Sequence, residues 1–113
     1  MARLRRYCGS YVLEFSGNYI REYCGPIRYE ISGNYVREYC GRILFQIDGD
    51  RIRDYCGPIR IDFNGTQIRE YCGPIRYVID GKYIREYCGK ILYEIEGFLS
   101  HREMMALIAV LFA

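Results

Sequence analysis

Cysteine is the most reactive side chain in this sequence, and it recurs at a fixed spacing of sixteen residues. The six positions are Cys8, Cys24, Cys40, Cys56, Cys72 and Cys88. None of them belongs to a Cys-x-x-Cys pair, so the pattern does not indicate the tetrahedral zinc site that such pairs form. The single histidine, His101, lies in a segment that lacks the second histidine of a zinc-protease motif. We interpret it as a solvated residue at the start of a helix.

The repetition itself argues against catalysis. An enzyme needs unlike groups that converge on one point, whereas this chain offers identical groups in rows. We therefore predict a protein that is not an enzyme, with no catalytic residue, no metal site and no cofactor. No small-molecule substrate is evident from the sequence.

The expected redox state of the cysteines depends on the compartment. The first fifteen residues contain no apolar stretch long enough for a signal peptide, which predicts a cytoplasmic protein with reduced thiols. Disulfides are the alternative, because an even number of cysteines in a short chain is typical of secreted disulfide-bonded proteins. As thiols, the six cysteines are expected to be small buried apolar residues that form a core cysteine ladder.

An arginine and a tyrosine, two residues apart, accompany five of these cysteines. This Arg/Tyr stripe consists of Arg21, Tyr23, Arg37, Tyr39, Arg53, Tyr55, Arg69, Tyr71, Arg85 and Tyr87. Both residue types are enriched in protein interfaces, which predicts a self-association face. The other interpretation is a tyrosine ladder that only stabilises the fold. An acidic residue inside each pair offsets the positive charge, and the net charge is only +2, so no nucleic-acid partner is expected.

The glycines divide the chain into two alternating half-repeats, because all twelve lie eight residues apart. Residues 25–32 (GPIRYEIS) typify the first half and residues 33–40 (GNYVREYC) the second. Each half leaves about six residues of strand character between glycines. In the first half, alternation places Ile27, Tyr29 and Ile31 on one buried face.

The second half-repeat is nearly invariant at five adjacent positions, which indicates a strand that is constrained on both faces. We expect Val36 and Cys40 to point inward and Arg37 and Tyr39 to point outward. Glu38 has no clear place in this scheme, because a carboxylate in a dry core must be paired.

Two architectures fit the repeat. The favoured one is a two-sheeted β-solenoid of six 16-residue coils, in which equivalent residues stack about 4.8 Å apart. The alternative is an antiparallel β-meander or barrel of 8-residue strand units, with Gly33-Asn34 as a hairpin turn, Ile31 opposite Val36 and Glu30 opposite Arg37. An open meander would expose a large apolar face, so it would have to close into a barrel or pair with a second copy.

The repeat ends near Gly97, and a helix is predicted after it. Ser100 and Glu103 have the spacing of a capping box, and residues 104–113 are entirely apolar. The tail is too short to span a membrane as a helix. We expect it to cap the open end of the repeat core, with an oligomer contact or membrane association as alternatives. The predicted domains are residues 1–97, the tandem 16-residue β-repeats, and residues 98–113, the C-terminal capping helix.

The period and the Gly/Tyr rhythm of residues 1–97 resemble those of bacterial tandem-repeat β-solenoid proteins. The period equals that of the bacterial ice-nucleation proteins. The resemblance implies a β-solenoid fold. The Thr-x-Thr rows of ice-binding solenoids are absent, because Thr66 is the only threonine.

These observations lead to an expected function. We expect a non-enzymatic structural, self-assembling β-repeat protein, dimeric through a flat sheet face. The alternative is a binding module that recognises a polyanion or a glycan through the Arg/Tyr stripe, and ice binding is a third possibility. The expected partner is a second copy of the chain.

Overall fold

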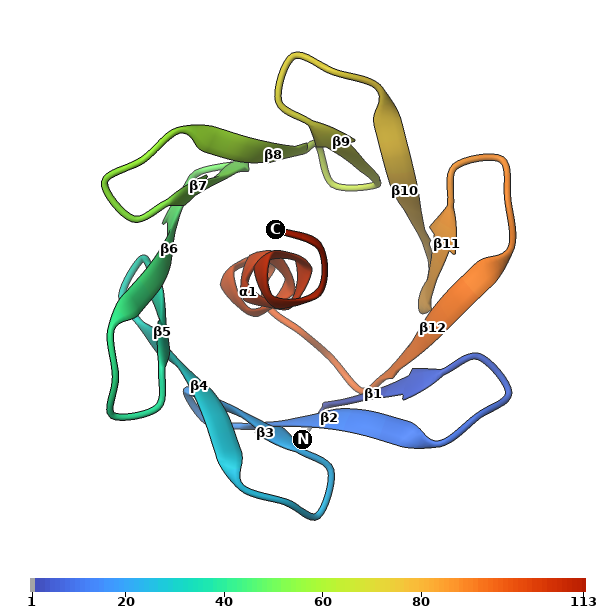
Figure 1. Ribbon diagram of the computed structural model, residues 1–113. Coiled ribbons are helices and arrows are strands. Elements are labelled where there is room, and N and C mark those ends of the chain that lie inside the picture. Colours follow the sequence, from blue (N-terminus) through green and yellow to red (C-terminus); the bar gives the residue numbers. More distant parts are fainter. Residues whose placement is uncertain (1) are drawn as a thin grey trace.

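The protein is a closed antiparallel β-barrel with a helix inside it (Figure 1). The computed structural model describes residues 2–113, so Met1, which the predicted repeat region includes, lies outside the described residues. Residues 2–113 form twelve strands and one helix. Their bounds are β1 Arg3–Arg6, β2 Tyr11–Ser16, β3 Tyr19–Glu22, β4 Ile27–Ser32, β5 Tyr35–Glu38, β6 Ile43–Asp48, β7 Arg51–Asp54, β8 Ile59–Phe63, β9 Gln67–Glu70, β10 Ile75–Asp80, β11 Tyr83–Glu86, β12 Ile91–Glu96 and α1 His101–Phe112.

The architecture is the meander, closed into a barrel, and the preference for a solenoid was wrong. Each strand pairs with its neighbours in the chain, and β1 pairs with β12 to close the ring. Ile31 lies opposite Val36 and Glu30 opposite Arg37, which is the predicted hairpin register. The resemblance to solenoids therefore extends only to a repeated all-β organisation. Because the sheet closes on itself, β1–β12 leave no open flat sheet. The expected dimer contact needs a flat sheet face, which this barrel does not offer.

Local turn chemistry explains why a hairpin forms where Gly33 joins the two half-repeats. Gly33 has a φ of +61° and takes the first position of the two-residue turn Gly33-Asn34. A type II′ hairpin turn requires a positive φ at that position and matches the twist of antiparallel strands. The glycine therefore reverses the chain within the sheet instead of turning the corner of a coil.

The sequence led us to expect that the helix covers one end of the repeat core. Instead, α1 fills the interior of the barrel. Residues 105–109 of α1 are buried, and they share one core with the barrel wall. The inward-facing centre of each short strand is at most 1% exposed, at Leu4, Ile20, Val36, Ile52, Ile68 and Ile84. Figure 1 shows α1 enclosed by the ring of strands. The apolar tail is thus the central part of the core.

A β-bulge changes the alternation of each longer strand. Ile20 pairs with Tyr29, but the next residue, Arg21, pairs with Ile27, so Arg28 is an extra residue in the register. A bulge resets which side chains face inward. Tyr29 and Ile31 contact the core, whereas Ile27 pairs with an outward-facing arginine and lies outside the core cluster. The prediction that Ile27 shares their face was therefore wrong.

The barrel is shallow and complete as a single chain. Its principal extents are 38 × 33 × 17 Å. The accessible surface is 6481 Å², close to the roughly 6,500 Å² expected of a monomer of this mass. Burying the core therefore requires no second copy. Among residues 2–113, no helix combines the length and the apolarity needed to cross a bilayer.

The bulge yields a matched pair of substitutions in β8. Ile61 is 6% exposed and belongs to the core, whereas Ile59 pairs with the outward-facing Arg53. We expect Ile61→Ala to lower the free energy of unfolding by about 2–5 kcal/mol, and Ile59→Ala by about 1 kcal/mol or less. Chemical denaturation of the two variants measures the difference. Equal losses would contradict the bulged register.

Candidate functional site

Six outward loops, which we call the petals, project from the barrel wall (Figure 1). Each contains a Tyr-Cys-Gly triplet, at residues 7–9, 23–25, 39–41, 55–57, 71–73 and 87–89. In the second petal, the Gly25 amide donates a 2.9 Å hydrogen bond to the Glu22 carbonyl. Cys24 has a φ of 55°. This is the conformation of the third residue of a type II turn.

The cysteines do not form the predicted core ladder. All six are exposed and free, and all have a φ of 55° or 56°. The physical reason is that the strand ends one residue before the tyrosine, so the cysteine belongs to a turn and its side chain leaves the barrel wall. The left-handed conformation costs an L-residue roughly 1–2 kcal/mol. The repeat therefore presents a thiol to solvent where glycine would be less strained.

The arginines of the Arg/Tyr stripe stabilise the petals. Nη2 of Arg37 donates to the Gly41 carbonyl at 2.7 Å, and Nη2 of Arg21 donates to the Gly25 carbonyl at 2.8 Å. The same bond recurs from Arg5, Arg53, Arg69 and Arg85 to the glycine four residues ahead. Each guanidinium is thus used within its own petal.

The tyrosines of the stripe pack on the neighbouring hairpin and do not stack on one another as a ladder. Tyr39 meets the ring of Tyr19 edge-on with 5.7 Å between centroids, and Tyr55 meets Tyr35 at 5.8 Å. Tyr7 meets Tyr83 at 5.9 Å and so continues the pattern across the closure. These rings are still 38–50% exposed in the six petals. Self-association through the stripe stays a prediction.

Nearby acidic groups raise the pKa of three tyrosine hydroxyls. The negative charge that Cys40 can carry beside it raises the pKa of Tyr39 above its usual value, and Cys8 does the same to Tyr7. On the barrel wall, a hydrogen bond to the Glu96 carboxylate raises the pKa of Tyr11. These three hydroxyls therefore lose their proton at a higher pH than a free tyrosine does.

The acidic residue that the sequence left unplaced lies at the base of the petal. Glu22 pairs with Arg28 at 3.2 Å, and Asp54 pairs with Arg60 at 3.2 Å. The third petal differs, because Glu38 pairs with Arg42 at 3.5 Å. These pairs are exposed, so each contributes at most about 1 kcal/mol. Their effect is to keep the petal bases close to neutral.

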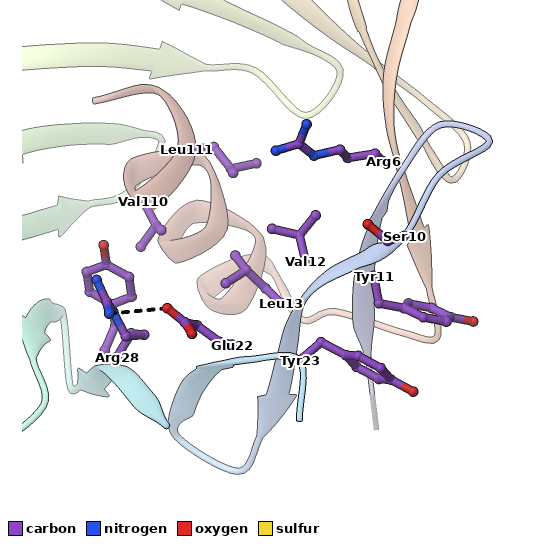
Figure 2. A pocket seen from close by; sticks show the side chains of 11 residues that line it. Arg6, Ser10, Tyr11, Val12, Leu13, Glu22, Tyr23, Arg28, Val110 and Leu111 are labelled. Atoms are coloured by element: carbon purple, nitrogen blue, oxygen red, sulfur yellow. Dashed lines mark ion pairs between the residues drawn. The ribbon is translucent and has the colours of Figure 1, made fainter. Parts of the chain in front are cut away.

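A groove runs around part of the C-terminal end of α1, and we call it the annular groove. Residues 110–113 form its inner wall, and the inner sides of the petals form its outer wall. Its largest part, of about 530 Å³, is drawn in Figure 2. Two further parts have volumes of about 430 and 410 Å³. Val12, Leu13, Val110 and Leu111 supply apolar surface to the largest part, whereas Tyr11 and Tyr23 point away from the helix.

Sequence reasoning missed the annular groove. Its outer wall includes the position that varies among Val12, Arg28, Arg60, Arg76 and Leu92, which the alternation pattern assigns to the solvent-facing side. The signal that was available is that valine and leucine are tolerated there. An apolar residue at an exposed position indicates a partly covered site.

The opposite end of α1 is anchored to two hairpin turns. The helix begins with the capping box: the Glu103 amide donates to the Ser100 hydroxyl at 3.3 Å, and the Ser100 amide donates to the Glu103 carboxylate at 2.9 Å. His101 Nε2 lies 3.3 Å from the Gly49 carbonyl, and Arg102 donates to the Gly33 carbonyl at 3.2 Å. Within residues 2–113, no group of three or more His, Cys, Asp or Glu side chains is arranged to hold a metal ion.

Comparison of the chain with protein-family models, with curated proteins and with solved structures finds no match.

The exposure of the petals makes a prediction about thiol reactivity. We expect all six cysteines of the native protein to react with Ellman's reagent at a rate close to that of the guanidinium-unfolded protein, because all six are exposed. Absorbance at the thionitrobenzoate band measures both rate and stoichiometry. A class of thiols that reacts only after unfolding would contradict the exposed turn.

Proposed function

We propose that the protein is a non-enzymatic binding module whose ligand surface is the annular groove. The observation that supports this is the apolar end of α1, where Val110, Leu111 and Phe112 are only partly buried and line the groove. Small-ligand sites are concave and largely apolar, with a few polar groups that fix orientation. The groove combines both kinds of surface: Val12, Val110 and Leu111 are apolar, and charged groups such as Arg6 and Glu22 lie beside them.

The inner wall of the groove is rigid, which favours binding. The turn of α1 that precedes it is fully buried, and Phe112 stacks on Tyr77 with 4.0 Å between ring centroids. A rigid surface loses little conformational entropy when a ligand binds. The groove therefore offers a preorganised apolar surface at one end of a fixed core.

The Arg/Tyr stripe is a weaker candidate for the binding surface. The guanidinium groups of Arg21, Arg37 and Arg53 already donate to carbonyls of their own petals. A polyanion or a glycan would have to compete with those hydrogen bonds. The annular groove requires no such exchange, so it ranks first.

The proposal is tested with a neutral apolar fluorophore, N-phenyl-1-naphthylamine. We expect the native protein to bind it with enhanced fluorescence, and Leu111→Lys to weaken binding about tenfold or more, because burial of a leucine side chain contributes roughly 1.5–3 kcal/mol. Phe98→Lys is the control, since Phe98 is 85% exposed and lies outside the groove. No binding by the native protein, or equal weakening by both variants, would contradict the proposal.

Self-association through the same face is the second candidate. The petal bases carry both charge signs in pairs, such as Glu22 with Arg28 and Glu70 with Arg76. A two-fold contact brings one patch against itself, and a surface of mixed sign is complementary to itself. One face of a disc with extents of 38 and 33 Å has room for the roughly 800 Å² per partner of a typical interface.

Sedimentation velocity over a range of concentrations tests this candidate. A dimer that Leu111→Lys converts to a monomer, and that Phe98→Lys leaves intact, is the expected result. Sodium chloride should weaken the dimer, because the petal charges are exposed to solvent. A native protein that remains monomeric at every concentration would eliminate self-association and leave the binding module.

A further inference from the structure

One petal base breaks the charge pattern of the other five. The residue that precedes the Tyr-Cys-Gly triplet is acidic in five petals, at Glu22, Glu38, Asp54, Glu70 and Glu86, but it is Arg6 in the first. The backbone of the first petal is nevertheless the same, with Cys8 at a φ of 56° and a 2.9 Å hydrogen bond from the Gly9 amide to the Arg6 carbonyl. The substitution therefore changes the charge at this place and not the fold.

Arg6 lies where two parts of the annular groove meet. It lines both the part of about 530 Å³ and the part of about 430 Å³, and Leu111 also lines both. Figure 2 shows the Arg6 side chain extending toward Leu111, with Val12 facing the same space. Leu92 and Tyr93 line the other side. A cationic group thus stands above an apolar surface that continues in both directions.

The guanidinium of Arg6 is free to bind an anion. Among residues 2–113, no carboxylate forms an ion pair with Arg6, whereas arginines of two other petals, Arg28 and Arg76, pair with Glu22 and Glu70. Its equivalents in the other petals are acidic, so no other petal offers the same combination. Charge complementarity therefore selects a negatively charged group at this one place.

We infer that the annular groove at Arg6 binds an amphiphilic monocarboxylate of the fatty-acid type. The carboxylate pairs with the guanidinium of Arg6, which can form two parallel hydrogen bonds to it, and the alkyl chain lies against Leu111 and Val12. This inference rests on the proposed function and adds the chemical class of the ligand. A singly charged head group is favoured over a phosphate, because Arg28, the other arginine that lines this part of the groove, already pairs with Glu22 and leaves Arg6 to bind the anion.

Isothermal titration calorimetry of the full chain tests the head group, with dodecanoate and dodecyl phosphate below their critical micelle concentrations and dodecanol below its solubility limit. We expect dodecanoate to bind about threefold to fivefold more tightly than dodecanol, because Arg6 is exposed and an exposed ion pair contributes little. Dodecanoate should also bind more tightly than dodecyl phosphate. Decanoate should bind more weakly than dodecanoate, by roughly fourfold for each methylene removed.

Matched variants test the role of Arg6. Arg6→Gln should abolish the preference for dodecanoate over dodecanol, and Arg6→Glu, which introduces the acidic type found in the other five petals, should reverse it. Arg60→Gln is the control: it removes the same charge from the same face, in a part of the groove that Arg6 does not line. The control should retain the preference within about 1.5-fold, a change that is smaller than the preference itself.

The outcomes separate this inference from the proposed function. If N-phenyl-1-naphthylamine binds in the groove but dodecanoate and dodecanol bind equally, the inference is wrong and the binding module stands. If Arg6→Gln and Arg60→Gln reduce dodecanoate affinity to the same extent, the carboxylate is attracted by the charge of the whole face. The assignment to Arg6 is then wrong. If neither the fluorophore nor any amphiphile binds, both are wrong.

Discussion

The packing of one apolar helix inside the barrel is the interaction on which the other features depend. The side chains of the wall fill the interior of an eight-stranded barrel. A barrel with more strands has a wider interior, which another element must fill. With twelve strands, the wall residues such as Ile52 meet α1 and form one core with it. A helix with its side chains is about 10–12 Å across, which suits the space that the wall leaves. Helix and wall therefore each require the other, since neither buries its apolar surface alone.

The two ends of the barrel have different roles because their turns differ. At one end, two-residue turns such as Gly33-Asn34 reverse the chain tightly, and the first residues of α1 bond to them. At the other end, the petals spread outward and leave a groove around the end of the helix. Repeated residues such as Arg37 and Tyr39 hold the petals in place. Residues that depart from the repeat, above all Arg6, are therefore the ones that can give the groove a specific ligand.

Much of the local structure could be predicted from the sequence, whereas its closure could not. The eight-residue strand units, the pairing of Ile31 with Val36 and the capping box at Ser100 all follow from local patterns. A 16-residue period, however, describes a coil and a hairpin equally well, and long-range pairing such as that of β1 with β12 leaves no local mark. The location of Cys40 was missed because its left-handed backbone is unusual for a residue other than glycine. The groove was missed because it exists only once the helix is inside.

The pairing of β1 with β12 also has a consequence for biosynthesis. The two strands are separated by the whole repeat region, so the hydrogen bonds that complete the ring join the earliest strand to the latest. As the hairpins emerge from the ribosome one after another, they can pair with their predecessors, but the free edge of β1 stays unsatisfied until β12 is made. An unpaired strand edge is a site of aggregation. Because β12 precedes α1 in the chain, the ring also lacks its filling until α1 has been made.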